Sequence, residues 1–279
     1  MTEAIGSTTL HAAGRRLEFD GHSTHVMAVL NLSPESRVAH SVVGSPEEAL
    51  ERARSYRSLG ASIIDLGAQS SHFENRELSV DEEIGRMLPA LRLLADDGFV
   101  VSVDTWKPEV ARAALDAGAG IVNDTGGLQD PVMVEMVAAT GAPAVVMYIE
   151  GRNPLVVGDL AFSADKPQEV AARFSARVDA LARDHGIREL ILDPGLSINY
   201  RSDYEEYGRQ QLRVIRGLGA LRALGHPVLV PVPRKADTHR MLAYLTLSLE
   251  YGADLIRVHD VEVACDLVRL FGRTAPPPA

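Results

Sequence analysis

Short apolar runs alternate with helix-periodic segments along the whole chain. Eight of these runs have the length and composition of buried strands, and turn residues or charged residues bound them. The predicted strands are His25–Asn31, Ser62–Leu66, Val100–Asp104, Gly120–Asn123, Ala144–Met147, Leu190–Asp193, Pro227–Val232 and Leu255–Val258. Segments such as Pro46–Leu59, Val80–Ala95 and Pro108–Ala117 are predicted to be helices. Since eight strand and helix units close a barrel, we predict the α/β fold of a (β/α)8 TIM barrel.

Two further patterns favour this barrel. A Gly-Ala pair precedes four of the predicted strands, at residues 60, 118, 141 and 252, and suits the left-handed residue that ends a helix. Before the first strand, Thr8–Phe19 has Ala13-Gly14 at its middle and is predicted to form a β-hairpin. We expect this N-terminal hairpin to plug the bottom of the barrel.

Size and composition bound the class of protein. With 279 residues, of which 46% are hydrophobic, the chain can bury one large core. We predict a single domain over residues 1–274, followed by a frayed Pro-rich tail at 275–279. A formal charge of −10 argues against nucleic acid as a partner, because phosphate binding requires a basic surface. A small-molecule enzyme is the favoured class.

The chain shows no signal for a membrane or an oxidising compartment. No apolar run reaches the roughly 18 residues that a membrane-spanning helix requires. The one cysteine, Cys265, lies on a predicted amphipathic helix and is interpreted as a packing residue. We therefore expect a cytoplasmic protein with no membrane partner.

Polar side chains stand at the end of nearly every predicted strand, where a barrel places its chemistry. Any one of them would suit a cap or a salt bridge, but a series of them in register indicates a site. Asp104, Asn123 and Asp193 suit a ligand rich in N–H groups, such as an aminopyrimidine. Lys235 and Arg257 add positive charge, either for the ligand or to neutralise the acids.

Seven ordered segments resemble a known family, and the resemblance extends from Thr8 to Phe271. The segments are Val26–Ser36, Ile63–Gly67, Val101–Val110, Ile121–Asp124, Leu192–Gly195, Arg234-Lys235 and Ile256–Val261. In this order they are similar to the successive signatures of dihydropteroate synthases. That family is a (β/α)8 barrel that joins a pterin methyl diphosphate to 4-aminobenzoate, with loss of pyrophosphate and the assistance of Mg²⁺.

The resemblance implies roles for individual residues of this chain. The expected pterin-binding residues are Asp104, Asn123, Met147, Asp193, Lys235 and Arg257. Asn31, Arg257 and His259 match the positions for the metal-bound diphosphate, with Asn31 as the metal ligand if Mg²⁺ is retained.

The loops around the second substrate depart from the family pattern. The acidic, glycine-bearing element of the first loop is absent after Ser36. In the second loop His72 replaces an arginine that binds diphosphate, and a neutral imidazole cannot reproduce a bidentate guanidinium. Leu196–Tyr200 replaces a glycine-rich loop, and Pro233 replaces a serine that touches aminobenzoate.

Because these differences fall on one subsite, we predict a transferase that passes a methyl or methylene unit from a reduced folate to an acceptor other than 4-aminobenzoate. Asp104 and Asp193 would orient the pterin, and Lys235 or a water would supply a proton near N5. The residues assigned to the anion or second substrate are Asn31, Ser71, His72, Tyr148, Asn199, Arg234 and His259. The expected ligands are a reduced folate or pterin, with Mg²⁺ as a candidate metal.

Two alternatives remain at this point: a true dihydropteroate synthase with unusual loops, and a non-catalytic pterin-binding protein. The family is often dimeric through helices late in the barrel. An apolar stripe at Met241, Leu242, Leu245 and Leu249 permits a homodimer here.

Overall fold

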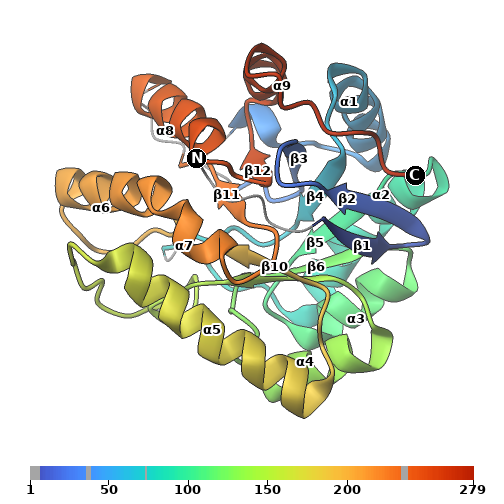
Figure 1. Cartoon of the computed structure of the whole chain (residues 1–279). Coiled ribbons are helices and arrows are strands. Elements are labelled where there is room, and N and C mark those ends of the chain that lie inside the picture. Colours follow the sequence, from blue (N-terminus) through green and yellow to red (C-terminus); the bar gives the residue numbers. More distant parts are fainter. Residues whose placement is uncertain (1–6, 36–38, 73, 234–237) are drawn as a thin grey trace.

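The structure, a computed structural model, is a barrel of parallel strands surrounded by helices, and it describes residues 7–35, 39–72, 74–233 and 238–279. The barrel strands are β3 (His25–Asn31), β4 (Ile63–Gly67), β5 (Val101–Asp104), β6 (Ile121–Asp124), β7 (Ala144–Met147), β10 (Leu190–Asp193), β11 (Leu229–Pro231) and β12 (Leu255–Val258). Their order is β10-β7-β6-β5-β4-β3-β12-β11, and every neighbouring pair is parallel (Figure 1). A parallel bridge between Leu192 and Val228 joins the two ends. The predicted (β/α)8 barrel is confirmed.

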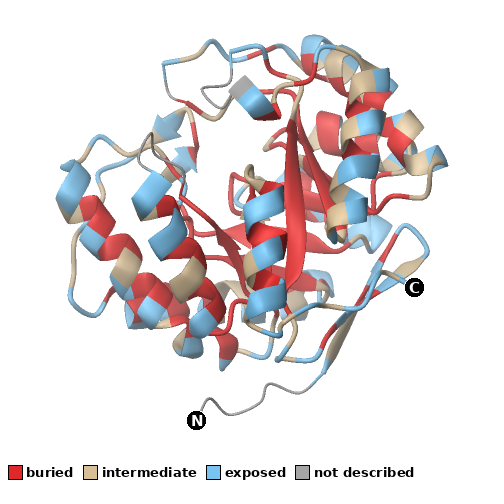
Figure 2. Ribbon diagram, turned by 90° about the horizontal axis from the view of Figure 1, so that it is seen from above, coloured by how far each residue is buried: buried red, intermediate tan, exposed pale blue. Residues whose placement is uncertain are grey.

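Helices cover the outside of this barrel. They are α1 (Pro46–Leu59), α2 (Val80–Asp96), α3 (Pro108–Asp116), α4 (Pro131–Thr140), α5 (Lys166–His185), α6 (Tyr204–Arg216), α7 (Leu218–Arg222), α8 (Thr238–Glu250) and α9 (Val261–Leu270). Figure 2 shows buried residues along the strands and exposed residues on the outward sides of the helices. The glycines of the four predicted Gly-Ala turns all have positive φ, between 67° and 116°, as left-handed helix ends require.

The N-terminal hairpin seals the lower end of the barrel. Strands β1 (Thr8–Ala12) and β2 (Arg15–Phe19) pair around Ala13 and Gly14, which both have positive φ, as a two-residue hairpin turn demands. Four hairpin residues pack against eight barrel residues. Seven of these come from the strands themselves, and Val100 directly precedes β5. This cluster, here called the lower layer, contains Leu10, Ala12, Leu17 and Phe19 with Met27, Ile63, Val100, Ile121, Val145, Ile191, Leu229 and Leu255. The prediction of a plug is confirmed.

Three segments differ from the sequence expectations. The long loop after β7 contains a small hairpin, β8 (Gly151–Asn153) with β9 (Val156–Val157), and a 3-10 turn, η1 (Ala39–Ser41), interrupts the first loop. The Pro-rich tail, expected to be frayed, returns to the N-terminal hairpin. There Ala279 and Arg16 exchange two backbone hydrogen bonds, of 2.8 and 3.1 Å.

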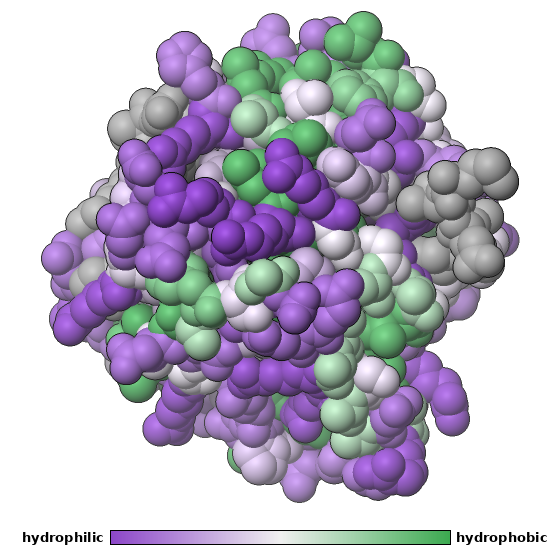
Figure 3. Space-filling model, turned by 60° about the vertical axis from the view of Figure 1, so that its left-hand side comes forward, coloured by the Kyte–Doolittle hydropathy of each residue, from purple (hydrophilic) through white to green (hydrophobic). Residues whose placement is uncertain are grey.

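The apolar stripe that would permit a dimer contact lies largely within the core of the chain. Met241, Leu245 and Leu249 are buried in the core, and only Leu242 is exposed, at 38%. On the face shown in Figure 3, hydrophobic residues form separate patches among hydrophilic ones. Cys265 is buried, as expected for a packing residue, and burial raises the pKa of its thiol to about 11. Among the described residues, no helix combines the length and apolarity that a membrane crossing needs.

Candidate functional site

The register of the barrel brings the predicted pterin-binding residues together. Asp104 pairs with Gly67 on one side and with Asn123 on the other, so their side chains lie at neighbouring strand ends. Asp193 pairs in the same way with Met147. Asp193, Asn123 and Met147 are each less than 5% exposed, and the Asp104 side chain is 15% exposed.

Arg257 connects the acids of the site from β12. Its Nη2 donates to Asp104 Oδ2 at 2.5 Å, and its Nε donates to Asp65 Oδ2 at 2.6 Å. A guanidinium plane held at two edges by carboxylates has a fixed orientation. Burial alone would lower the pKa of Arg257, but the two carboxylates outweigh burial and raise it.

Asp65 on β4 is the central residue that the sequence assignments missed. It is fully buried and accepts hydrogen bonds from Ser102, Asn123 and Arg257. The pattern did contain a signal, because a carboxylate inside the buried run 63–67 requires donors from its neighbours. That signal does not show which strands supply them, since the barrel register decides this.

Two carboxyl groups of the site have pKa values near neutral pH. Burial raises the pKa of Asp104 to about 7, although Arg257 opposes the shift, and Asp65 and Glu83 add to it. Burial likewise raises the pKa of Asp193 to about 7, against the effect of the Gly195 N–H. A ligand that donates N–H groups to these carboxylates would favour their ionised forms.

The backbone after β10 is built around Asp193. Gly195 N donates to Asp193 Oδ1 at 2.7 Å, and Gly195 has a φ of +71°. A Cβ atom at this position would lie 2.0 Å from the carbonyl oxygen of Tyr148. Only glycine therefore allows this turn to hold the carboxylate.

Asn123 presents an unsatisfied acceptor. Its Nδ2 faces Asp65, at 3.2 and 3.3 Å from the two carboxylate oxygens, while its Oδ1 is buried and accepts no hydrogen bond from the residues described. Native proteins seldom leave such an atom unpaired, so this oxygen is a candidate for contact with a ligand N–H group.

An apolar group adjoins the polar cluster. Met147, Ile149 and Ile198 pack together, and Val157 and Tyr200 cover them. The divergent segment 196–200 thus supplies a wall next to Met147. The Tyr200 hydroxyl accepts from Glu150 N at 2.8 Å, which ties this wall to the loop after β7.

Two of the three residues predicted for the diphosphate, Asn31 and His259, meet at Ser41. Asn31 Nδ2 donates to Ser41 Oγ at 2.7 Å, and His259 Nδ1 lies 3.0 Å from the same hydroxyl. Ser41 is fully buried, and the 3-10 turn of the first loop places it there. The sequence assignments missed Ser41 because this loop departs from the family pattern.

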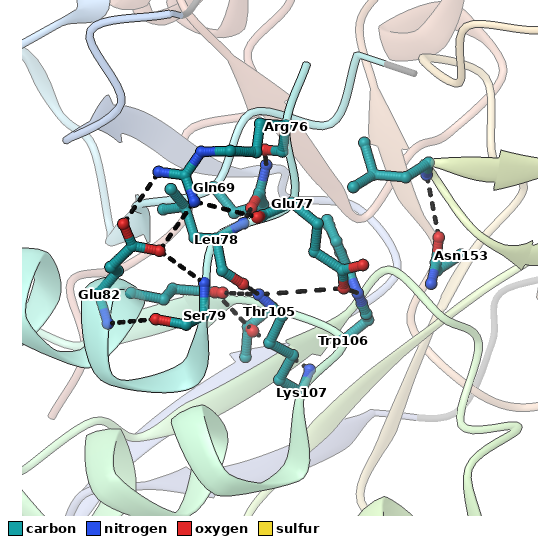
Figure 4. Close-up of polar contacts among 12 residues, drawn as sticks. Gln69, Arg76, Glu77, Leu78, Ser79, Glu82, Thr105, Trp106, Lys107 and Asn153 are labelled. Atoms are coloured by element: carbon teal, nitrogen blue, oxygen red, sulfur yellow. Dashed lines mark hydrogen bonds and ion pairs between the residues drawn. The ribbon is translucent and has the colours of Figure 1, made fainter. Parts of the chain in front are cut away.

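The second loop is held in place by the turn that follows β5, as Figure 4 shows. Lys107 Nζ donates to Leu78 O at 2.6 Å and to Glu83 Oε2 at 2.8 Å. Gln69 closes the loop on itself, because its Oε1 accepts from Leu78 N at 2.6 Å and its Nε2 donates to Arg76 O at 3.2 Å.

The predicted second-substrate residues of this loop differ in burial. His72 is 9% exposed, and its Nδ1 accepts from Glu74 N at 3.2 Å, whereas Ser71 is half-buried. The site therefore has a buried imidazole where the sequence predicts an anion contact.

Other residues assigned to the second substrate are less supported. The Tyr148 ring packs on the outer side of β7 against Phe174, with ring centroids 6.4 Å apart, and its hydroxyl donates to Glu150. This contact gives no support to placing Tyr148 at the acceptor. Asn199 is half-buried beside Ile198. Arg234 and Lys235 lie outside the described residues.

No group of three metal-binding acids, histidines or cysteines occurs among the residues described. A Mg²⁺ ion held chiefly by diphosphate oxygens needs few protein ligands, and amide or carboxylate oxygens suit it. Because Asn31 turns its Nδ2 toward Ser41, its Oδ1 is the atom that fits this role.

Comparisons with known proteins agree with this arrangement. Residues 27–259 match the model of the family described as pterin binding enzyme. A dihydropteroate synthase of Synechocystis is 33% identical, over 90% of each chain. The structure of the Thermus thermophilus dihydropteroate synthase in complex with 4-aminobenzoate has a TM-score of 0.78 and 34% identity, over 95% of this chain and 99% of that one. The Yersinia pestis enzyme with a sulfonamide drug complex has a TM-score of 0.82 and 28% identity, over 96% and 99%.

These relatives correct the predicted reaction. The hypothesis of a reduced-folate one-carbon transferase with an acceptor other than 4-aminobenzoate is wrong, because relatives at 31–33% identity over most of the chain are named dihydropteroate synthases. That hypothesis depended on loop sequences alone. Loops diverge more readily than the strands that position the chemistry, so their differences do not establish a different reaction.

Proposed function

The chain belongs to the pterin-binding enzyme family that includes the dihydropteroate synthases, and from this premise we propose that it is itself a dihydropteroate synthase. The proposal is that it joins 4-aminobenzoate to a pterin methyl diphosphate. One observation supports it above the others. The acceptors Asp104, Asp193 and Asn123 Oδ1 converge on one end of the barrel, beside the fixed guanidinium of Arg257.

The pterin ring is the partner that these acceptors suit. A pterin offers several N–H donors along one edge, and paired carboxylates accept such donors with good geometry. Met147 would lie against the ring. We keep Lys235 as a further pterin contact, on the basis of its motif alone.

In the proposed reaction the amine nitrogen of 4-aminobenzoate forms a bond to the pterin methylene carbon. The bond from that carbon to the diphosphate oxygen breaks, diphosphate leaves with the bonding electrons, and the new amine loses a proton. Asn31 and His259 would face the diphosphate. Mg²⁺, held by the diphosphate and by Asn31 Oδ1, would stabilise the charge of the leaving group.

The aminobenzoate side is proposed to differ from the family pattern in its walls. Ile198 and Tyr200 provide an apolar and an aromatic surface next to Met147. Ser71, His72, Asn199 and Arg234 remain candidates for the mouth of this subsite. We also propose a homodimer and a cytoplasmic location. The molar mass by light scattering tests the first, and cell fractionation tests the second.

The test of the synthase activity is turnover of purified protein. The protein is incubated with a dihydropterin methyl diphosphate and Mg²⁺, with and without 4-aminobenzoate, while released diphosphate and dihydropteroate are measured. We expect the two products in equal amounts, and only when 4-aminobenzoate is present. If the pterin binds but no dihydropteroate forms, the activity is refuted and a pterin-binding role remains.

A further inference from the structure

Asp65 lies at the centre of the polar cluster, with the partners described above. It is 0% exposed. Ser102 Oγ donates to its Oδ1 at 2.7 Å, Arg257 Nε donates to its Oδ2 at 2.6 Å, and Asn123 Nδ2 is shared between both oxygens. Three other strands therefore direct donors to one carboxylate, and it accepts in every case, as an ionised carboxylate does.

This arrangement fixes the orientation of the Asn123 amide. Only the NH2 end of an amide can donate to a carboxylate, so Asp65 turns Nδ2 toward itself. The opposite atom, Oδ1, then has to face away from Asp65, and it is buried without a donor from the described part of the chain. A buried acceptor in this state is costly until a ligand satisfies it. An N–H group of the ligand opposite Asn123 Oδ1 would satisfy this acceptor.

The same carboxylate orients Arg257. With Nε held by Asp65 and Nη2 held by Asp104, the guanidinium plane cannot rotate without breaking one of two short contacts. Loss of Asp65 would leave Arg257 with a single described carboxylate contact and a less defined plane.

We propose that Asp65 is a positioning residue of the active site. It acts through Asn123 and Arg257, and it determines that the site presents an acceptor to the ligand at Asn123. The chemical class thereby selected is a heteroaromatic ring with an N–H donor at that edge. This inference rests on the proposed function for the identity of that ring as a pterin.

The test uses two single variants and one exchange. Asp65→Asn removes the charge that orients both partners, and we expect pterin affinity to fall about 10- to 100-fold, the range for losing one or two such contacts. Ser102→Ala removes one hydrogen bond to Asp65 and should weaken pterin binding by about 2- to 5-fold. The exchange Asp65→Asn with Asn123→Asp again places a donor against an acceptor and again presents an oxygen to the ligand. It should bind pterin at least about 5-fold better than Asp65→Asn.

Two measurements separate this role from a structural one. Binding of a reduced hydroxymethyl pterin is titrated directly, and KM and kcat are determined for each substrate. We expect the pterin constants to change while KM for the aminobenzoate substrate stays within about 2-fold. The matched control is Asp254→Asn at the other end of β12, a buried acid that pairs with Arg222 at 3.2 Å. It should lower stability and leave the pterin affinity unchanged.

Each outcome is decisive. A folded Asp65→Asn protein with wild-type pterin affinity overturns the positioning role, and so does an exchange variant that binds no better than Asp65→Asn. A wild-type protein that binds pterin, loses it in Asp65→Asn and yet forms no dihydropteroate would refute the synthase activity and support this inference. A wild-type protein that binds no pterin refutes both.

Discussion

Two layers of the barrel interior are built from the same strands, two residues apart, and they differ in chemistry. The lower layer is entirely apolar and the hairpin seals it. Moving two residues along each strand from the lower layer gives the upper layer: Val29, Asp65, Ser102, Asn123, Met147, Asp193, Pro231 and Arg257. The lower layer stabilises the fold, since a fully buried leucine contributes about 2 kcal/mol. The upper layer buries charge, which costs stability, and the proposed function explains this cost by ligand binding.

A second comparison lies along β12. At its start Asp254 accepts from Arg222 and from the backbone N–H of Val228, and Arg222 also donates to the carbonyl of Gly21. At its end Arg257 donates hydrogen bonds to both Asp65 and Asp104, and Asp193 lies near enough to raise the pKa of Arg257. The first set of contacts joins two side chains to backbone groups of the fold, and we interpret it as structural. The excess of acceptors at the other end indicates a place for donors that the described residues do not supply.

The largest effect is expected from removing an acceptor at the mouth. Asp104→Ala should lower kcat/KM for the pterin substrate about 100- to 1000-fold, because the ligand loses a charged acceptor and Arg257 loses a partner. Initial rates of dihydropteroate formation measure the effect, and a thermal melt shows that the barrel is folded. A decrease smaller than about 5-fold would remove Asp104 from the pterin site.

The complementary change is in the lower layer. Leu17→Ala deletes a fully buried side chain between the hairpin and the barrel, so we expect a loss of about 2–5 kcal/mol in the free energy of unfolding. KM for the pterin substrate should not change, since the site lies above this layer. Leu270→Ala is the matched control, because Leu270 is 75% exposed and its loss should leave stability unchanged. An altered pterin KM in folded Leu17→Ala would show that the layers are coupled.

The lower layer and the strands could be predicted from sequence because period and length define them. Four of the predicted strands, His25–Asn31, Ala144–Met147, Leu190–Asp193 and Leu255–Val258, match the observed bounds. The α1 bounds also match, since Pro46 begins the helix and Gly60 ends it in a left-handed conformation.

The hydrogen bonds of the upper layer could not be predicted in the same way. Alternation places Asp65 inside the barrel, but its partners come from three other strands whose register the sequence does not state. Ser41 depends on a 3-10 turn in a loop without periodicity. By contrast, the outward direction of Tyr148 continues the alternation of β7, in which Val145 and Met147 face the barrel interior, and it could have been predicted.

The pH dependence of stability should distinguish the upper layer from the lower layer. Burial raises the pKa of Asp193 to about 7 from 3.8, so the folded protein keeps a proton that the unfolded chain loses. Stability therefore falls as pH rises through the window from about 4 to about 7. Asp193→Asn lacks this titration, and its stability relative to wild type should increase across the window by about 1–3 kcal/mol.

Urea unfolding of both proteins at several pH values between 4 and 8 measures this difference. A stability difference that stays constant over the window would show that Asp193 titrates normally. The upper and lower layers would then differ in polarity but not in how they make stability depend on pH.

The smallest effect is expected at Ser41, which joins Asn31 to His259 outside both layers. Ser41→Ala removes a hydrogen bond from each of them, so we expect KM for the pterin methyl diphosphate to rise about 3- to 10-fold. Affinity for a reduced pterin without the diphosphate should not change, because the upper layer is intact. Ser248→Ala is the control, since Ser248 is equally buried and its hydroxyl donates to Tyr244 O within α8. If Ser41→Ala weakened both ligands equally, Ser41 would support the whole mouth of the barrel. The diphosphate residues and the upper layer would then form one cooperative site instead of two.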